Sequence, residues 1–129
     1  MAGTYLFDTS AAIALMRRDA ALRAKFPSLD DAYISVVSLG ELYFGAEKSS
    51  KVENNRQQAN LIASEISVLG GDIETAQHYG KIKQQLKAKG RPIPENDIWI
   101  AAFAMRYNLT LLTRDAHFGE VEGLAVQGW

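Results

Sequence analysis

Four acidic residues stand where the sequence changes from one predicted element to the next. Asp8 and Asp115 each follow a short apolar run, while Glu41 and Asp97 each open a predicted helix. Carboxylates gathered in one place repel one another, so they either take up protons or bind a cation. Oxygen ligands without His or Cys favour Mg²⁺ or Mn²⁺. The chemistry that uses such sites is phosphoryl transfer, in which the ion polarises a phosphate and lowers the pKa of an attacking water.

Each of the four acids also has a purely structural interpretation. Asp8 can cap the helix that follows it, and Glu41 completes an S-x-x-E capping box that begins at Ser38. Asp97 can cap the apolar helix behind it, and Asp115 can form a turn. Their joint placement favours a shared site, because ligands of parallel sheets bind outside the carboxyl ends of the strands.

Short β-prone runs alternate along the chain with segments whose apolar residues recur at helical spacing. The predicted strands are 4–7, 33–36, 67–69, 110–113 and 125–127. The predicted helices are 11–17, 20–26, 38–48, 52–66, 72–89 and 97–107. Strands separated by helices indicate the α/β class, with a central parallel sheet flanked by helices on both faces. No repeat or linker interrupts the pattern, so we expect one domain over residues 1–129.

The composition fits a single domain that works in a reducing compartment. The chain has 129 residues, 47% of them hydrophobic, which suffices for one core without disulfides or structural metal. It contains no cysteine. Residues 1–8 carry no basic leader, and their apolar stretch is far shorter than the roughly 20 residues that cross a bilayer. We therefore expect a cytoplasmic protein without a membrane segment.

A local basic segment is the best candidate for contact with nucleic acid. The formal net charge is only -1, which excludes a basic field over the whole molecule. Residues 75–94 contain no Asp or Glu but include Lys81, Lys83, Lys87, Lys89 and Arg91. Among these, Lys83, Lys87 and Arg91 follow i, i+4 spacing and are predicted to bind RNA phosphates. A solvated helix face is the alternative interpretation.

Four segments of the chain contain the candidate acids, namely YLFDT at 5–9, ISVVSLGELYFG at 34–45, PENDIWIAA at 94–102 and LLTRDAHF at 111–118. These segments resemble the motif blocks of PIN-domain ribonucleases, and of the VapC toxin family in particular. Each block is modestly specific, but their order and separations are family-like, and the likeness continues to Trp129. Two departures are Ser10 and Arg114, which stand where Asn is commoner, and Arg114 is expected to alter substrate contacts.

The resemblance implies both a site and a function. Asp8, Glu41, Asp97 and Asp115 would be the catalytic acids and metal ligands, supported by the hydroxyls of Thr9 and Thr113. The implied protein is a Mg²⁺-dependent endoribonuclease, with Mn²⁺ possible, that forms the toxin of a type II toxin–antitoxin system. A homodimer is implied as well, together with an antitoxin that occupies the active-site groove.

Other functions remain open from the sequence alone. One is a PIN nuclease of RNA maturation or decay without an antitoxin, and another is a non-catalytic binding module that keeps the fold. A receiver-like phosphoacceptor is disfavoured, because no paired acids follow the first strand. The RNA that is cut is not encoded in any motif.

Three further features receive mainly structural interpretations. His117 is not expected to act as a base, since a four-acid site needs no imidazole. Trp99, Phe103 and Tyr107 are expected to form a buried helix stripe or a dimer contact. Gly45 lies one helical turn beyond Glu41 and allows close approach of substrate or another helix.

Overall fold

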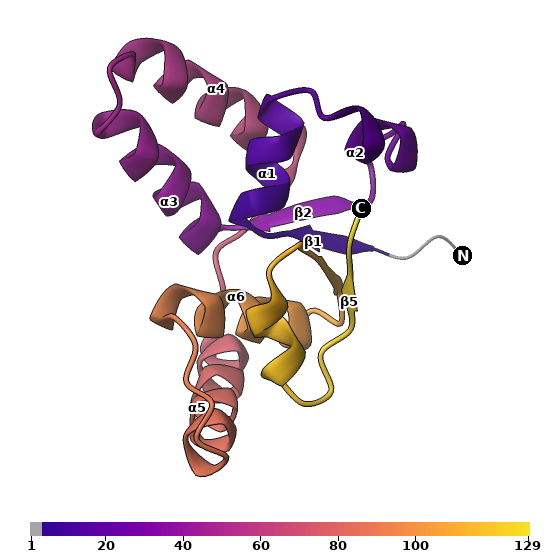
Figure 1. Cartoon of the computed structure of the whole chain (residues 1–129), viewed down its shortest axis with the longest axis vertical. Coiled ribbons are helices and arrows are strands. Elements are labelled where there is room, and N and C mark those ends of the chain that lie inside the picture. The colour runs from indigo at the N-terminus through magenta and orange to yellow at the C-terminus, as the bar shows by residue number, and fades with distance from the viewer. Residues whose placement is uncertain (1–3) are drawn as a thin grey trace.

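A parallel β-sheet crosses the middle of the molecule (Figure 1). The computed structural model describes residues 4–129; residues 1–3, part of the N-terminus for which no leader is predicted, lie outside this range. The sheet has five strands in the order β3-β2-β1-β4-β5, and every neighbouring pair is parallel. The strands are β1 Tyr5–Phe7, β2 Ala32–Ser35, β3 Ser67–Leu69, β4 Thr110–Leu112 and β5 Val126–Gln127. The predicted α/β arrangement is confirmed.

Helices cover both faces of this sheet, as predicted. One face carries α1 to α4 and the other carries α5 and α6 (Figure 1). The bounds of the helices are α1 Thr9–Met16, α2 Ala20–Lys25, α3 Val36–Glu47, α4 Val52–Glu65, α5 Ile73–Ala88, α6 Glu95–Arg106 and the 3-10 helix η1 Ala116–Glu120. The predicted elements are therefore all present, with ends that differ by at most two residues.

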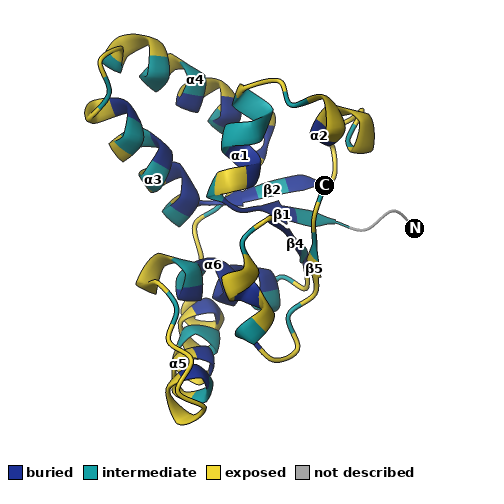
Figure 2. Ribbon diagram, in the orientation of Figure 1, coloured by how far each residue is buried: buried dark blue, intermediate teal, exposed yellow. Residues whose placement is uncertain are grey.

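Two hydrophobic cores lie on opposite faces of the sheet, because successive side chains of a strand point to opposite sides. Leu6 and Leu111 pack against α5 and α6, whereas Phe7 and Leu112 pack against the helices of the other face. Figure 2 shows the central strands β1, β2 and β4 largely buried and the outer helix faces exposed. Burial of one such side chain stabilises the fold by about 1.5–3 kcal/mol, so the two cores hold the sheet between its two layers of helices.

Two predicted helix starts are wrong, and both concern candidate site residues. Helix α3 begins directly after β2, and Ser35 is its N-cap, accepting a 3.1 Å hydrogen bond from the backbone N–H of Ser38. Because β2 ends one residue early and no loop follows, Glu41 is the sixth residue of α3 and takes part in no capping box. Helix α6 begins after Pro94, so Asp97 lies inside its first turn and is not its N-cap.

The predicted ends of α5 are confirmed, since Asp72 caps the helix and Gly90 follows it. Asp72 and Thr75 form a capping box, and Gly90 has a φ of 67°, a left-handed conformation that favours glycine. At 16 residues, α5 is shorter than the roughly 20 residues that span a bilayer. Between residues 4 and 129, no helix is long and apolar enough to cross a membrane.

Candidate active site

Asp8 is a buried carboxylate between the end of β1 and the start of α1. Its side chain is the N-cap of α1, where Oδ1 accepts 2.7 Å hydrogen bonds from the Ala11 N–H and from Ser10 Oγ. Its other oxygen, Oδ2, accepts a hydrogen bond from Thr113 Oγ1. Burial raises the pKa of Asp8, and these three hydrogen bonds only partly oppose that rise. The capping interpretation is therefore correct, and it leaves Oδ2 with a free lone pair.

Thr113 and Asp115 follow β4, which lies next to β1 in the sheet. Thr113 is buried, and its hydroxyl oxygen accepts a 2.9 Å hydrogen bond from the backbone N–H of Asp115. Asp115 is the N-cap of η1, accepting a 3.0 Å bond from the His117 N–H. Its negative charge contributes to the raised pKa of Asp8. Neighbouring parallel strands thus bring two of the predicted acids to one edge of the sheet.

Glu41 reaches the same region from α3. Its Oε1 accepts a 2.5 Å hydrogen bond from the hydroxyl of Thr9, the first residue of α1. Thr9 directly follows Asp8 in the chain, so this bond ties the middle of α3 to the N-terminal end of α1. Each of the two threonines that the family resemblance indicated therefore donates a hydrogen bond to a predicted acid: Thr9 to Glu41, and Thr113 to Asp8.

Asp97 projects from the first turn of α6, with 17% of its side chain exposed. Burial is the main cause of its raised pKa, and repulsion from Asp115 and Glu41 raises it further. These electrostatic effects connect Asp97 with acids from two other segments. Asp97 and Asp115 have ligand atoms within 4.8 Å of each other, and Glu41 and Asp8 lie near enough for their charges to interact with this pair.

His117 also faces these acids, which the sequence analysis did not foresee. Its Nδ1 lies 3.0 Å from Asp115 Oδ1 and 3.4 Å from Asp97 Oδ2. The cap that Asp115 provides to η1 turns the His117 side chain back toward the acids. The D-x-H spacing at 115–117 is a signal that could have indicated this contact, because an N-cap and the residue two positions later are close.

The donor set fits a divalent cation. Two of the carboxyl groups, Asp8 and Asp97, have raised pKa values, chiefly because burial disfavours their charged forms, and repulsion from neighbouring acids adds to the rise. Ligand atoms of Asp97, Asp115 and His117 all lie within 4.8 Å of one another. A bound cation would relieve the repulsion, and oxygen-rich sites of this kind suit Mg²⁺ and Mn²⁺.

The predicted RNA-binding residues lie in different electrostatic surroundings. Lys83 is already paired with Glu95, at 3.1 Å, and contacts the hydroxyl of Tyr79. Lys87 is exposed in the last turn of α5. Arg91 lines a hollow of about 400 Å³ together with Ile93, Glu120 and His117. Because His117 contacts Asp97 and Asp115, Arg91 borders the acidic site more closely than the sequence spacing implied.

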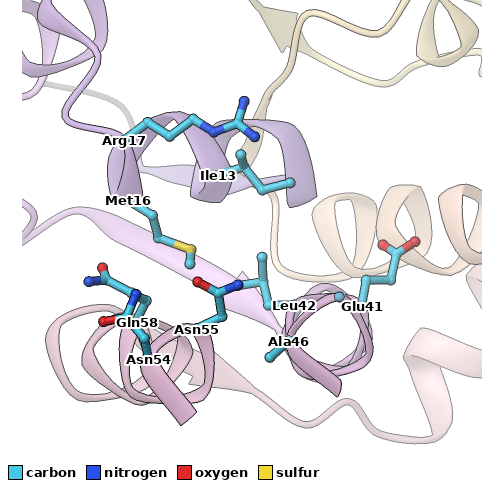
Figure 3. Close-up of a pocket in the computed structure, with 10 residues that line it drawn as sticks. Ile13, Met16, Arg17, Glu41, Leu42, Ala46, Asn54, Asn55 and Gln58 are labelled. Atoms are coloured by element: carbon cyan, nitrogen blue, oxygen red, sulfur yellow. The ribbon is translucent and has the colours of Figure 1, made fainter. Parts of the chain in front are cut away.

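A groove between α1, α3 and α4 begins at Glu41. Its volume is about 370 Å³, and its lining combines apolar side chains with amides. Figure 3 shows Ile13 and Met16 extending from α1 into the groove, with Glu41 at one end and Gln58 near the other. Gly45 also lines it, and a Cβ atom there would meet nothing within 4 Å. Within residues 4–129, no other helix therefore packs closely on Gly45, and approach of substrate at this position stays a prediction.

Arg114 does not face the site, contrary to the expectation that it alters substrate contacts. Its guanidinium donates 2.5 and 3.0 Å hydrogen bonds to the backbone oxygen of Trp129 and lies 4.4 Å from the centre of the Trp129 ring. A cation stacked on an aromatic ring is held by that contact and by its hydrogen bonds. Arg114 therefore holds the end of the chain against the sheet.

The aromatic stripe of α6 has the structural role that its spacing predicted. Phe103 is 2% exposed and belongs to the core. The Trp99 ring stacks on Tyr79 of α5, with ring centroids 4.0 Å apart. Tyr107 is partly buried against the same core.

Comparisons with known proteins agree with this geometry. The family model described as "PIN domain" matches residues 5–124. The tRNA(fMet)-specific endonuclease VapC of Shigella flexneri is 34% identical, and the ribonuclease VapC1 of Haemophilus influenzae strain R2866 is 32% identical, each over 97% of both chains. The crystal structure of DNA-bound VapBC from Salmonella typhimurium contains a chain with a TM-score of 0.93 and 29% identity, matched over 99% of both chains. The VapBC-1 structure from nontypeable H. influenzae contains a chain with a TM-score of 0.85 and 32% sequence identity, matched over 98% of both chains.

Proposed function

The chain belongs to the PIN-domain family, and within that family we infer that it is a metal-dependent endoribonuclease that serves as the toxin of a type II toxin–antitoxin pair. The observation that supports this inference is the proximity of Asp97 and Asp115, whose charges also interact with those of Glu41 and Asp8. Relatives named as ribonucleases match the chain over nearly its full length. The whole chain, residues 1–129, is proposed to act as a single catalytic domain.

We assign the four acids as catalytic residues and metal ligands. A divalent cation bound there, Mg²⁺ or Mn²⁺, supplies a Lewis acid that polarises a backbone phosphate and lowers the pKa of water. The chain's own residues hold the carboxylates in place: Thr113 orients Asp8, and Thr9 orients Glu41. Such supporting hydrogen bonds fix the orientation of ligands and tune the site.

The products follow from water as the nucleophile. Water attacks the phosphorus, and the bond to the 3′ oxygen of the preceding nucleotide breaks. This leaves a 3′-hydroxyl on one fragment and a 5′-phosphate on the other. The ribose 2′-hydroxyl takes no part in the displacement. Arg91, and more weakly Lys87 and Lys83, are proposed to neutralise neighbouring phosphates of the RNA.

An antitoxin segment is the proposed occupant of the groove between α1, α3 and α4. Apolar side chains of the segment would bury Ile13, Met16 and Leu42, and its polar groups would meet the amides of α4. Glu41 stands at the end of the groove, so an Arg at the end of the segment would reach the acids and block them by charge complementarity. Solved structures of relatives are described as VapBC complexes.

A second copy of the chain is proposed to cover the edge of the sheet formed by β3. Val68 of β3, Val36 of α3 and Ile73 of α5 are 41%, 48% and 79% exposed. Val36 and the residues just before Ile73 line a hollow of about 530 Å³. Clustered exposed apolar side chains are typical of protein–protein contacts. The proposed place of action is the cytoplasm, where both RNA and antitoxin are found.

The decisive experiment measures cleavage of RNA by the purified chain, freed of any antitoxin. Cleavage should require Mg²⁺ or Mn²⁺, stop with EDTA, and return when the metal is restored. Fragments should carry 5′-phosphates, detected by direct adapter ligation. Undiminished cleavage in a chelated, metal-free sample would contradict the mechanism. Complete inactivity with every metal would favour the non-catalytic binding module instead.

The antitoxin has its own test. A gene for a short DNA-binding protein should lie directly beside the gene for this chain, and the two products should copurify and lose ribonuclease activity. A cleaving enzyme with no such neighbour would instead be a nuclease of RNA maturation or decay.

A further inference from the structure

His117 is the strongest feature of the site that the proposed mechanism does not use. The imidazole comes from η1, the segment that follows β4, and half of its side chain is exposed. Its Nδ1 faces two carboxylate oxygens that belong to different elements, Oδ2 of Asp97 and Oδ1 of Asp115. No other titratable nitrogen among residues 4–129 lies within salt-bridge distance of the four acids.

We propose that His117 is a nitrogen ligand of the cation site, and that with Asp97 and Asp115 it makes this site prefer first-row transition ions such as Co²⁺ over Mg²⁺. The inference rests on the proposed function only in that the same carboxylates hold the cation. It adds a residue and a metal preference that the four acids alone do not provide.

The spacing of the three donor atoms suits a single ion. Ligands about 2.1 Å from one ion and at right angles to each other lie about 3.0 Å apart. The Nδ1 atom is 3.0 Å from one oxygen and 3.4 Å from the other. All three donor atoms fall within 4.8 Å of one another. The three side chains are therefore close enough for small side-chain adjustments to let one ion contact all of them.

The chemistry of the donors determines the preference. Carboxylate oxygens suit Mg²⁺, Ca²⁺ and Mn²⁺, whereas imidazole nitrogen suits Zn²⁺, Ni²⁺ and related ions. Mg²⁺ requires near-ideal octahedral oxygen coordination and gives up its water reluctantly. One nitrogen beside two carboxylates therefore strengthens the binding of Co²⁺, Ni²⁺ and Zn²⁺ while adding little for Mg²⁺.

The immediate surroundings leave room for an ion at this place. Asp115 is 38% exposed and Asp97 is 17% exposed, so the donors border solvent. The hollow lined by Arg91, Ile93, Glu120 and His117 opens beside them. Arg91 is the nearest full positive charge in that lining, and no described salt bridge connects it to the acids.

The test uses Co²⁺ as the probe, because its visible absorption changes with its ligands and coordination geometry and needs no RNA. Wild type, His117→Gln and the matched control His78→Gln are titrated with Co²⁺ at about pH 8, and with Mg²⁺ by calorimetry. His78 is the other histidine of the chain and lies on α5, where no described ion pair involves it. Melting temperatures establish that each variant is folded.

We expect His117→Gln to raise the Kd for Co²⁺ by more than about tenfold and to shift the visible spectrum. Even the loss of a residue that only hydrogen-bonds to a metal ligand lowers metal affinity by about 10- to 100-fold. The Kd for Mg²⁺ should stay within about twofold, and His78→Gln should match wild type. An unchanged Co²⁺ affinity, or equal losses for both metals, would overturn the proposal, because His117 would then only position the two acids.

A further variant separates this inference from the proposed function. Asp97→Asn should weaken both Co²⁺ and Mg²⁺, and unchanged binding of both would also overturn the proposal. If wild type binds Co²⁺ through His117 yet cleaves no RNA, the metal preference stands and the ribonuclease proposal fails. If RNA is cleaved but His117→Gln leaves Co²⁺ binding intact, the ribonuclease proposal stands and the proposed metal preference fails.

Discussion

The hydroxyl of Thr113 links two acids, donating a hydrogen bond to Oδ2 of Asp8, a residue 105 positions earlier, and accepting one from the N–H of Asp115. We predict that Thr113→Val weakens metal binding by about 10- to 100-fold, because Asp8 loses its orientation and a bond that lowers its pKa. The partly buried N–H of Asp115 also loses its partner, which lowers stability. Thr113→Ser keeps the hydroxyl and should therefore retain the metal affinity and the stability of wild type, both measured by calorimetry. Equal metal affinity in all three proteins would contradict this role.

Asp97→Asn is predicted to reduce RNA cleavage by at least about a hundredfold, which corresponds to about 2.7 kcal/mol of transition-state stabilisation. Asp97 is not a helix cap, so the isosteric amide removes charge without removing a structural hydrogen bond. Without metal, the melting temperature should therefore equal or exceed that of wild type. Near wild-type cleavage at saturating Mg²⁺ would remove Asp97 from the site.

The same variant predicts a pH dependence. The folded-state pKa of Asp97 is raised, so the folded protein binds more protons than the unfolded chain and loses stability as pH rises through that pKa. The amide side chain of the variant cannot ionise. The stability of Asp97→Asn relative to wild type should therefore increase from acidic to neutral pH in EDTA, as followed by urea unfolding. A difference in stability between the two proteins that is the same at every pH would show that folding does not raise the pKa of Asp97.

Replacement of Lys83, Lys87 and Arg91 together by Ala should weaken RNA binding and flatten its salt dependence, with metal affinity unchanged. Each lost phosphate contact lowers the logarithmic salt slope by about 0.7 for single-stranded RNA. Arg91→Ala alone should have a larger effect than Lys83→Ala, because Glu95 already neutralises Lys83. Binding is measured with the inactive Asp97→Asn protein, and Lys81→Ala on the outer face of α5 is the control. An unaltered salt dependence of RNA binding would show that these three residues form a solvated helix face and do not contact RNA.

Gly45→Phe should fill the groove beside Glu41 and weaken antitoxin binding by more than about tenfold. The matched control is Gly80→Phe, since Gly80 also lies inside a helix, has open space around its Cβ position, and lines a different hollow. Replacement of either glycine by Ala should instead stabilise the fold by about 0.5–1 kcal/mol. Antitoxin affinity is measured by calorimetry, and equal effects of the two Phe variants would exclude the groove as the docking site.

Ile73→Asp should convert the proposed homodimer into a monomer. Ile73 is the most exposed of the large apolar side chains described, and Asp at the first position of α5 is compatible with the helix dipole. Val126→Asp places the same charge on β5, at the opposite edge of the sheet, and should leave the dimer intact. Light scattering after gel filtration distinguishes the two. A dimer that survives Ile73→Asp would place the interface elsewhere.

The sequence alone determined the order of the elements and the neighbourhood of the acids. Apolar runs alternating with helical periodicity predict a parallel sheet, and parallel strands present their carboxyl ends at one edge. Asp8 directly follows β1 and Asp115 lies three residues beyond the end of the neighbouring strand β4, so their proximity follows from the topology. The motif blocks added Glu41 and Asp97, which local patterns alone assigned equally well to helix caps.

Tertiary structure decided where individual side chains point. Ser35 rather than Ser38 caps α3, because the end of β2 is set by its register with β1 and β3. Glu95 of α6 forms an ion pair with Lys83 of α5. Arg114 donates a hydrogen bond to the backbone oxygen of Trp129 and does not face the site. His117 turns toward Asp97 only because η1 and α6 meet in space. Contacts between residues distant in sequence depend on packing, and no local pattern of residue types encodes them.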